Sequence, residues 1–260
     1  VGKLFMAGVI PGLLLTLMMM LAIYFVTRNM DIEYSPKASF KEVLRSGREA
    51  LWGLMLVIII MGGIYAGVFT PTEAAAVAAV YAFIVVVFIY KDLKLAEIPK
   101  VLTESAKLTV TLMFIIANAY VFAFVLTTEQ IPQSAAEVIL SSGLSPWMFL
   151  LVVNLLLLVA GNFIDPASVI LIVVPIIFPI AMKLGIDPIH LGIILVINME
   201  IGLVTPPVGL NLFVTSGVTG LTLVEMIHAA LPWLLLLLTA LMLITYVPII
   251  STFLPDLMFD

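Results

Sequence analysis

Two short polar segments interrupt otherwise apolar stretches of this sequence, and they hold most of the residues that could do chemistry. One covers residues 161–166 (GNFIDP) and the other residues 198–211 (NMEIGLVTPPVGLN). Proline has no amide hydrogen, so a proline leaves a carbonyl oxygen one turn earlier without its helical partner. Carbonyl oxygens at such a break suit a small cation such as Na⁺, whereas free N–H groups suit a carboxylate.

The two breaks therefore predict a site for Na⁺. Its candidate ligands combine flexible backbone with side-chain oxygens: Gly161, Asn162, Asp165, Gly202, Thr205 and Pro206. Three further polar residues are candidates for the substrate side of the site: Asn198, Glu200 and Asn211. Glu200 could be a counter-charge, a proton carrier or the partner of another buried residue, since an unpaired charge inside a membrane is costly. The alternative interpretation is a pair of structural kinks satisfied by neighbouring helices.

A capping residue followed by proline recurs along the chain and predicts helix starts. It occurs at five places: Thr70-Pro71, Ser145-Pro146, Asp165-Pro166, Asp187-Pro188 and Thr205-Pro206. The oxygen of the first residue can accept from a free backbone N–H, and proline at the first helical position has no N–H to lose. With Glu73 three residues after Thr70, this start reads as a capping box, so Glu73 is predicted to be structural.

The residues offer little support for catalysis, for thiolate metal sites or for nucleic-acid binding. The chain has no cysteine, which excludes disulfides, thiolate metal sites and cysteine nucleophiles. An intramembrane hydrolase needs a Ser–His or Ser–Lys pair or two aspartates at membrane depth, and only Asp165 lies there. Asn118 and Asn154 are predicted to bond between helices, and His190 and His228 to lie at an interface. We therefore expect no enzyme, and the net charge of −5 offers no basic stripe for nucleic acid.

The elements that carry these residues are membrane helices. Hydrophobic residues make up 63% of the chain and charged residues 10%, against roughly 45–50% and 25% in soluble domains. Six apolar stretches approach the roughly 20 residues that a spanning helix needs: 4–27, 50–68, 71–90, 107–126, 189–217 and 226–250. The fold class predicted is an all-α polytopic protein in a lipid bilayer, with 189–217 as a broken helix.

Residues 146–182 differ, because the 161–166 break divides them into arms of only about 22–26 Å at 1.5 Å per residue. The hydrocarbon core is about 30 Å thick, which favours a re-entrant hairpin. Two tilted crossings are the alternative.

Basic residues orient the chain. Five lie in the first loop and four around the third: Arg28, Lys37, Lys41, Arg45, Arg48, Lys91, Lys94, Lys100 and Lys107. Lys3 and Lys183 fall on the other side. This asymmetry predicts cytoplasmic loops at 29–48 and 91–106 and an outward-facing carboxyl terminus. Phe40, Val43 and Leu44, interleaved with basic residues, predict an amphipathic helix lying on the inner surface.

Residues 1–25 align with 222–246, pairing Pro11 with Pro232, and an odd number of crossings separates them. Opposed repeats are typical of secondary transporters. The predicted organisation is the last helix of a truncated first repeat (1–28), amphipathic segments and scaffold helices (29–106), a transport region (107–217) with the hairpin and the broken helix, and a final helix and tail (218–260).

Four runs resemble the large membrane subunit of tripartite ATP-independent periplasmic (TRAP) transporters, in its carboxyl-terminal portion. They are 63–75 (GIYAGVFTPTEAA), 161–166, 185–190 (GIDPIH) and 200–211. The resemblance implies an inverted-repeat, elevator-type, Na⁺-coupled importer of organic acids such as C4-dicarboxylates or sialic acid, in a bacterial inner membrane. It also implies two partners, a small membrane (Q) subunit and a periplasmic substrate-binding (P) protein, and a Na⁺ site between the hairpin and the broken helix. The alternatives are a single-chain Na⁺- or H⁺-coupled anion symporter and a structural membrane subunit.

Overall fold

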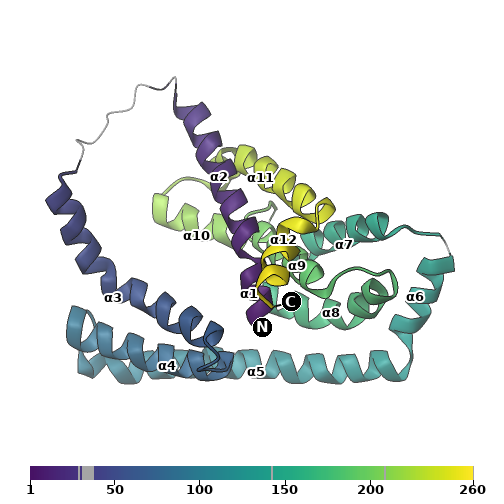
Figure 1. The fold of residues 1–260 in the computed structure, drawn as a ribbon, viewed down its shortest axis with the longest axis horizontal. Coiled ribbons are helices and arrows are strands. Elements are labelled where there is room, and N and C mark those ends of the chain that lie inside the picture. The colour runs from purple at the N-terminus through teal and green to yellow at the C-terminus, as the bar shows by residue number, and fades with distance from the viewer. Residues whose placement is uncertain (29, 31–37, 142, 208, 260) are drawn as a thin grey trace. The chain divides into compact units, whose positions relative to one another are not determined.

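The computed structural model describes residues 1–28, 30, 38–141, 143–207 and 209–259, and the regular structure in them is helical (Figure 1). Six helical stretches are long and apolar enough to cross a membrane: Gly2–Thr27, Phe40–Tyr65, Pro71–Tyr90, Leu95–Thr128, Pro166–Lys183 and Leu223–Tyr246. The predicted all-α polytopic class is confirmed. The chain divides into two compact units, Val1–Gly2 with Asn29–Thr111, and Lys3–Arg28 with Leu112–Asp260.

The first unit is built around two packed helices, α3 (Phe40–Tyr65) and α4 (Pro71–Ile84), and α4 continues into the π-helical segment η1 (Val85–Tyr90). Capping boxes begin both helices, at Ser39 with Glu42 and at Thr70 with Glu73. The structural role predicted for Glu73 is thus confirmed. The short η2 (Leu95–Glu97) leads into α5 (Ile98–Thr128), which extends into the second unit.

The second unit gathers its helices around α9 (Pro188–Gly202), which is buried along most of its length. The helices α7 (Pro146–Gly161), α8 (Pro166–Lys183), α11 (Leu223–Tyr246) and α12 (Ile249–Phe259) all pack against it. Leu191, Ile194 and Met199 are at most 1% exposed and join the apolar core. The remaining helices are α1 (Gly2–Ala7), α2 (Val9–Thr27), α6 (Ile131–Ser141) and α10 (Leu210–Thr219).

Two details differ from the expected elements. The amphipathic segment does not form a separate surface helix, since Phe40 begins a single 26-residue helix that continues to Tyr65. Its residues favour helix without a break, and no proline or cap stands between them and the apolar run. Residues 29 and 31–37 lie outside the described residues. The 18-residue α8 is long enough to span a membrane by itself, so the helix lengths allow both readings of 146–182, and re-entrance stays a prediction.

Candidate functional site

The two helix breaks meet in the structure. Gly161 is the last residue of α7 and Gly202 the last of α9, and both are buried. A Cβ added to Gly202 would lie 2.8 Å from the Cα of Gly161 and 2.9 Å from its carbonyl oxygen. A Cβ added to Gly161 would lie 3.3 Å from the Cα of Gly202. The close approach thus requires glycine at 202, whereas a side chain at 161 would need a shift of a few tenths of an ångström.

At the first break, Asp165 is the N-cap of α8. Its Oδ1 accepts from the backbone N of Ser168 at 3.1 Å, and its Oδ2 accepts from the Ser168 hydroxyl. The amide oxygen of Asn162 is buried and has no hydrogen-bond partner in the structure. Such an acceptor is costly to bury alone, so the first break holds one bonded carboxylate and one amide oxygen that is available to a ligand.

At the second break, Thr205 does not begin a helix, and the expected restart at Thr205-Pro206 is wrong. Its hydroxyl donates backwards to the carbonyl oxygen of Ile201 at 2.6 Å, and α10 begins only at Leu210, after Gly209 with φ of 47°. An N-cap oxygen accepts from the second or third helical N–H. After Thr205 the second position would be Pro207, which has no N–H, so only the third position could donate to a cap.

Two carbonyl groups of this second break have backbone partners. The carbonyl of Gly202 accepts from the N–H of Thr205 at 3.2 Å, and the carbonyl of Leu203 accepts from the N–H of Asn211 at 3.0 Å. Among the described residues, the carbonyl of Gly161 accepts no backbone hydrogen bond beyond those within the helices. Within the part of the chain that the structure describes, the Asn162 amide oxygen is buried without a partner, and the carbonyls of Gly161, Thr205 and Pro206 accept no such backbone bond.

The three substrate-side candidates are not brought together. Asn198 is completely buried, whereas Glu200 and Asn211 are exposed. The Asn198 amide nitrogen donates to the side-chain oxygen of Asn154 and to the carbonyl of Ile194, both at 2.8 Å. Because both N–H bonds are used, the orientation of the amide is set, and its Oδ1 is left buried without a partner.

A buried polar network continues from Asn198 and was only partly anticipated. Asn154 donates to the Thr245 hydroxyl at 3.0 Å, so its predicted interhelical role is confirmed. Asn118, in contrast, donates to the Phe114 carbonyl of its own helix. His190, predicted to lie at an interface, is buried within the protein at 2% exposed. Its Nδ1 lies 2.6 Å from the Ser251 hydroxyl and its Nε2 lies 3.1 Å from the Thr245 carbonyl.

A signal for this network was present in the sequence. Asn154 and Asn198 each stand alone in a long apolar run, and a lone amide in such a run needs an interhelical partner. The identity of the partner depends on which helices are neighbours.

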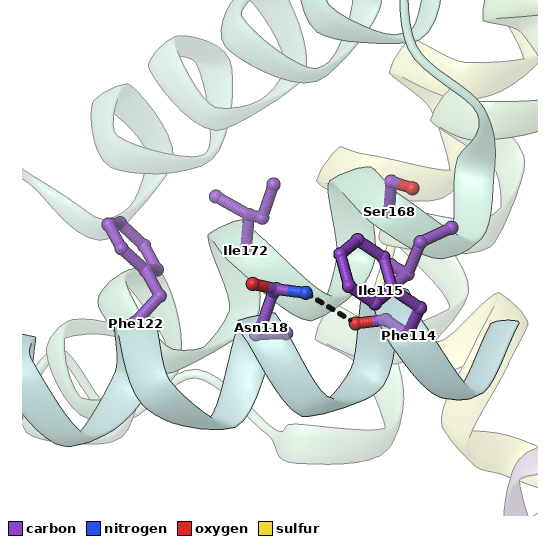
Figure 2. Close-up of a pocket in the computed structure, with 7 residues that line it drawn as sticks. Phe114, Ile115, Asn118, Phe122, Ser168 and Ile172 are labelled. Atoms are coloured by element: carbon purple, nitrogen blue, oxygen red, sulfur yellow. Dashed lines mark hydrogen bonds between the residues drawn. The ribbon is translucent and has the colours of Figure 1, made fainter. Parts of the chain in front are cut away.

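A cavity of about 400 Å³ lies beside the first break, between α5 and α8 (Figure 2). Its wall is apolar and mostly aromatic or branched, with two polar residues: Phe114, Ile115, Asn118, Ala119, Phe122, Ser168 and Ile172. The backbone N–H and the hydroxyl of Ser168 donate to the Asp165 carboxylate, so the cavity adjoins the polar groups of the first break. Within the described part of the chain, no three His, Asp or Glu side chains form a group that could hold a metal.

Long apolar helices, interrupted at two points that meet deep in the protein, define a class of polytopic membrane proteins that includes many transporters. The family comparison is specific. The model of the tripartite ATP-independent periplasmic transporter, DctM component, matches residues 1–250, and the chain belongs to this family.

The similar curated proteins agree. The chain is 65% identical over 256 residues to the C4-dicarboxylate TRAP transporter large permease protein DctM of Pseudomonas aeruginosa, covering 98% of this chain and 60% of that protein. It is 52% identical to the protein of the same name from Rhodobacter capsulatus (99% and 59%). It is 37% identical to the sialic acid TRAP transporter large permease protein SiaM of Vibrio cholerae (99% and 60%). The chain thus spans about 60% of the length of these relatives.

Proposed function

We propose that this chain is part of the membrane subunit of a Na⁺-coupled importer of organic acids, with C4-dicarboxylates as its substrates. The observation that carries the proposal is the contact between Gly161 and Gly202, which joins two helix breaks inside the second unit. Irregular backbone at membrane depth is tolerated where it is buried in protein or lines a watery cavity. The substrate class rests on the names of the two relatives with 65% and 52% identity.

Sodium fits the oxygens at this contact. The carbonyl of Gly161 and the amide oxygen of Asn162 need a partner, and the Asp165 carboxylate would supply negative charge. Thr205 and the Gly202 carbonyl would complete the shell after small movements, since each already has one hydrogen bond. Hard cations take such oxygen ligands in preference to nitrogen or sulfur.

The family description also supports two partners. A tripartite transporter with a periplasmic component implies a small membrane subunit and a periplasmic binding protein that delivers the organic acid. We place the protein in a bacterial inner membrane with the carboxyl terminus in the periplasm, because nine basic residues fall on the opposite side.

The test is Gly202→Ala in the complete transporter. The added methyl would meet the Gly161 backbone at 2.8 Å, and overpacking of this kind costs about 1–3 kcal/mol. We expect Na⁺-driven succinate uptake in proteoliposomes to fall by at least about tenfold, which corresponds to 1.4 kcal/mol. Gly217→Ala is the matched control, since a Cβ there meets open space. Uptake by the unaltered transporter that is independent of Na⁺ would refute the proposed coupling.

A further inference from the structure

The first part of α3 carries an apolar surface that the rest of its unit does not cover. Phe40 is 82% exposed, Val43 57% and Leu44 65%. Together with three neighbours they form a groove of about 520 Å³ that we call the α3 groove: Phe40, Val43, Leu44, Gly47, Arg48 and Leu51. Gly47 lies in the groove without a side chain, and a Cβ there would meet nothing within 4 Å, so a larger residue fits.

The α3 groove lies next to the end of the neighbouring membrane span. The Tyr90 hydroxyl donates to the Glu49 carbonyl at 2.7 Å, and the Tyr81 hydroxyl donates to the Trp52 carbonyl at 2.9 Å. These bonds place residues 49–52 beside the second half of the Pro71–Tyr90 span, which Lys91 follows. Tyrosine and tryptophan mark the membrane interface. Residues 40–48 therefore lie at the interface end of α3, next to the end of this span.

Positive charge borders the groove on one edge. At 3.6 residues per turn, Lys41 and Arg48 stand beside the apolar stripe. Arg45 lies farther round the helix and pairs with Glu49 at 3.0 Å, whereas no ion pair among the described side chains involves Lys41 or Arg48. Long basic side chains at this depth extend their charge into the headgroup layer while their stems cover apolar surface.

We propose that the α3 groove binds an anionic phospholipid. Its phosphate lies against Lys41 and Arg48, and an acyl chain follows the notch at Gly47 between Phe40 and Leu51. Amphipathic basic segments bind membranes in this way, by buried apolar area together with attraction to anionic headgroups. A bound lipid would cover this exposed apolar surface at the membrane interface, and it would anchor the first unit at this end.

The experiment measures lipid retained by the complete purified transporter, by native mass spectrometry after exchange into dioleoyl-phosphatidylglycerol or dioleoyl-phosphatidylcholine. We expect phosphatidylglycerol to be retained preferentially. The double variant Lys41→Gln/Arg48→Gln should weaken its retention by about thirtyfold, because each basic residue near the surface contributes about fivefold. Lys100→Gln/Lys107→Gln removes the same charge from α5 and should leave retention unchanged.

A second variant tests the shape of the groove without changing its charge. Gly47→Leu fills the notch without a clash and should remove retention while the transporter stays folded, whereas Gly53→Leu, also in open space on α3, should not. Equal retention of phosphatidylcholine, or equal losses in the variant and control pairs, would overturn the proposal. So would a photo-crosslinker at Val43 that captures the small membrane subunit in place of lipid.

Discussion

At the scale of single residues, the structure separates local roles from roles that depend on distant partners. Asp165 combines both. Its two carboxylate oxygens hold the first turn of α8 through Ser168, and it stands three residues after the unpartnered oxygen of Asn162. A charged N-cap stabilises its helix by about 1 kcal/mol, so substitution of Asp165 must be designed to separate capping from ion binding.

Two substitutions make that separation. Asp165→Asn retains an oxygen that can accept from Ser168 N but removes the charge, whereas Asp165→Ala removes both. If Asp165 contacts Na⁺, both variants should raise the Na⁺ concentration for half-maximal uptake, by about tenfold or more, while membrane insertion changes little. A fluorescence thermal shift should show a lower Tm only for Asp165→Ala. An unchanged Na⁺ dependence together with poor insertion of Asp165→Ala would mean that Asp165 is only a helix cap.

At the scale of helices, the buried amides connect the elements that carry the breaks. Asn198 on α9 bonds to Asn154 on α7, and Asn154 bonds to Thr245 on α11. The Thr245 carbonyl lies beside His190, eight residues before Asn198 on α9. These bonds restrict the sliding of α7 along α9, and the same two helices bring Gly161 and Gly202 into contact.

The energetic coupling of these helices can be measured. Asn154→Leu leaves the Thr245 hydroxyl and one N–H of Asn198 without their partner, at about 1–2 kcal/mol for an interhelical bond in a membrane. We expect a lower Tm in detergent. The double variant Asn154→Leu/Asn198→Leu should be less unstable than the sum of the single variants, because an apolar pair replaces the polar pair.

Asn118→Leu is the matched control for this series. Asn118 is exposed and bonds only within α5, so its loss should change the Tm much less. Strict additivity of the Asn154 and Asn198 variants would contradict the coupling.

At the scale of the whole molecule, the distribution of basic residues predicts the orientation. Single cysteines report it directly, since the chain contains none. We expect Ser46→Cys and Glu97→Cys to be shielded from an impermeant maleimide in intact cells, and Ser141→Cys to be labelled. All three residues are exposed in the structure. Permeabilised cells should show labelling at all three positions, and labelling of Ser46→Cys or Glu97→Cys in intact cells would reverse the orientation.

The sequence by itself determined the class of protein and the local features. Apolar length and composition identify membrane helices, because the bilayer acts as a solvent of known thickness. The caps at Thr70, Ser145, Asp165 and Asp187 could be predicted from their neighbours, since an N-cap bonds only two or three residues ahead. Thr205 has the same pattern but bonds backwards to Ile201, and no helix begins there, since α10 starts only at Leu210.

Only the tertiary structure decided which of these residues meet. The approach of Gly161 to Gly202, separated by 41 positions in the chain, depends on the packing of α7 against α9. The burial of His190 depends on α11 and α12, which supply Thr245 and Ser251 far along the sequence. Uniformly apolar helices show no stripe that marks the face toward a neighbour, since lipid and protein core are equally apolar. Their contacts follow from shape and from a few polar bonds, and those exist only in the assembled fold.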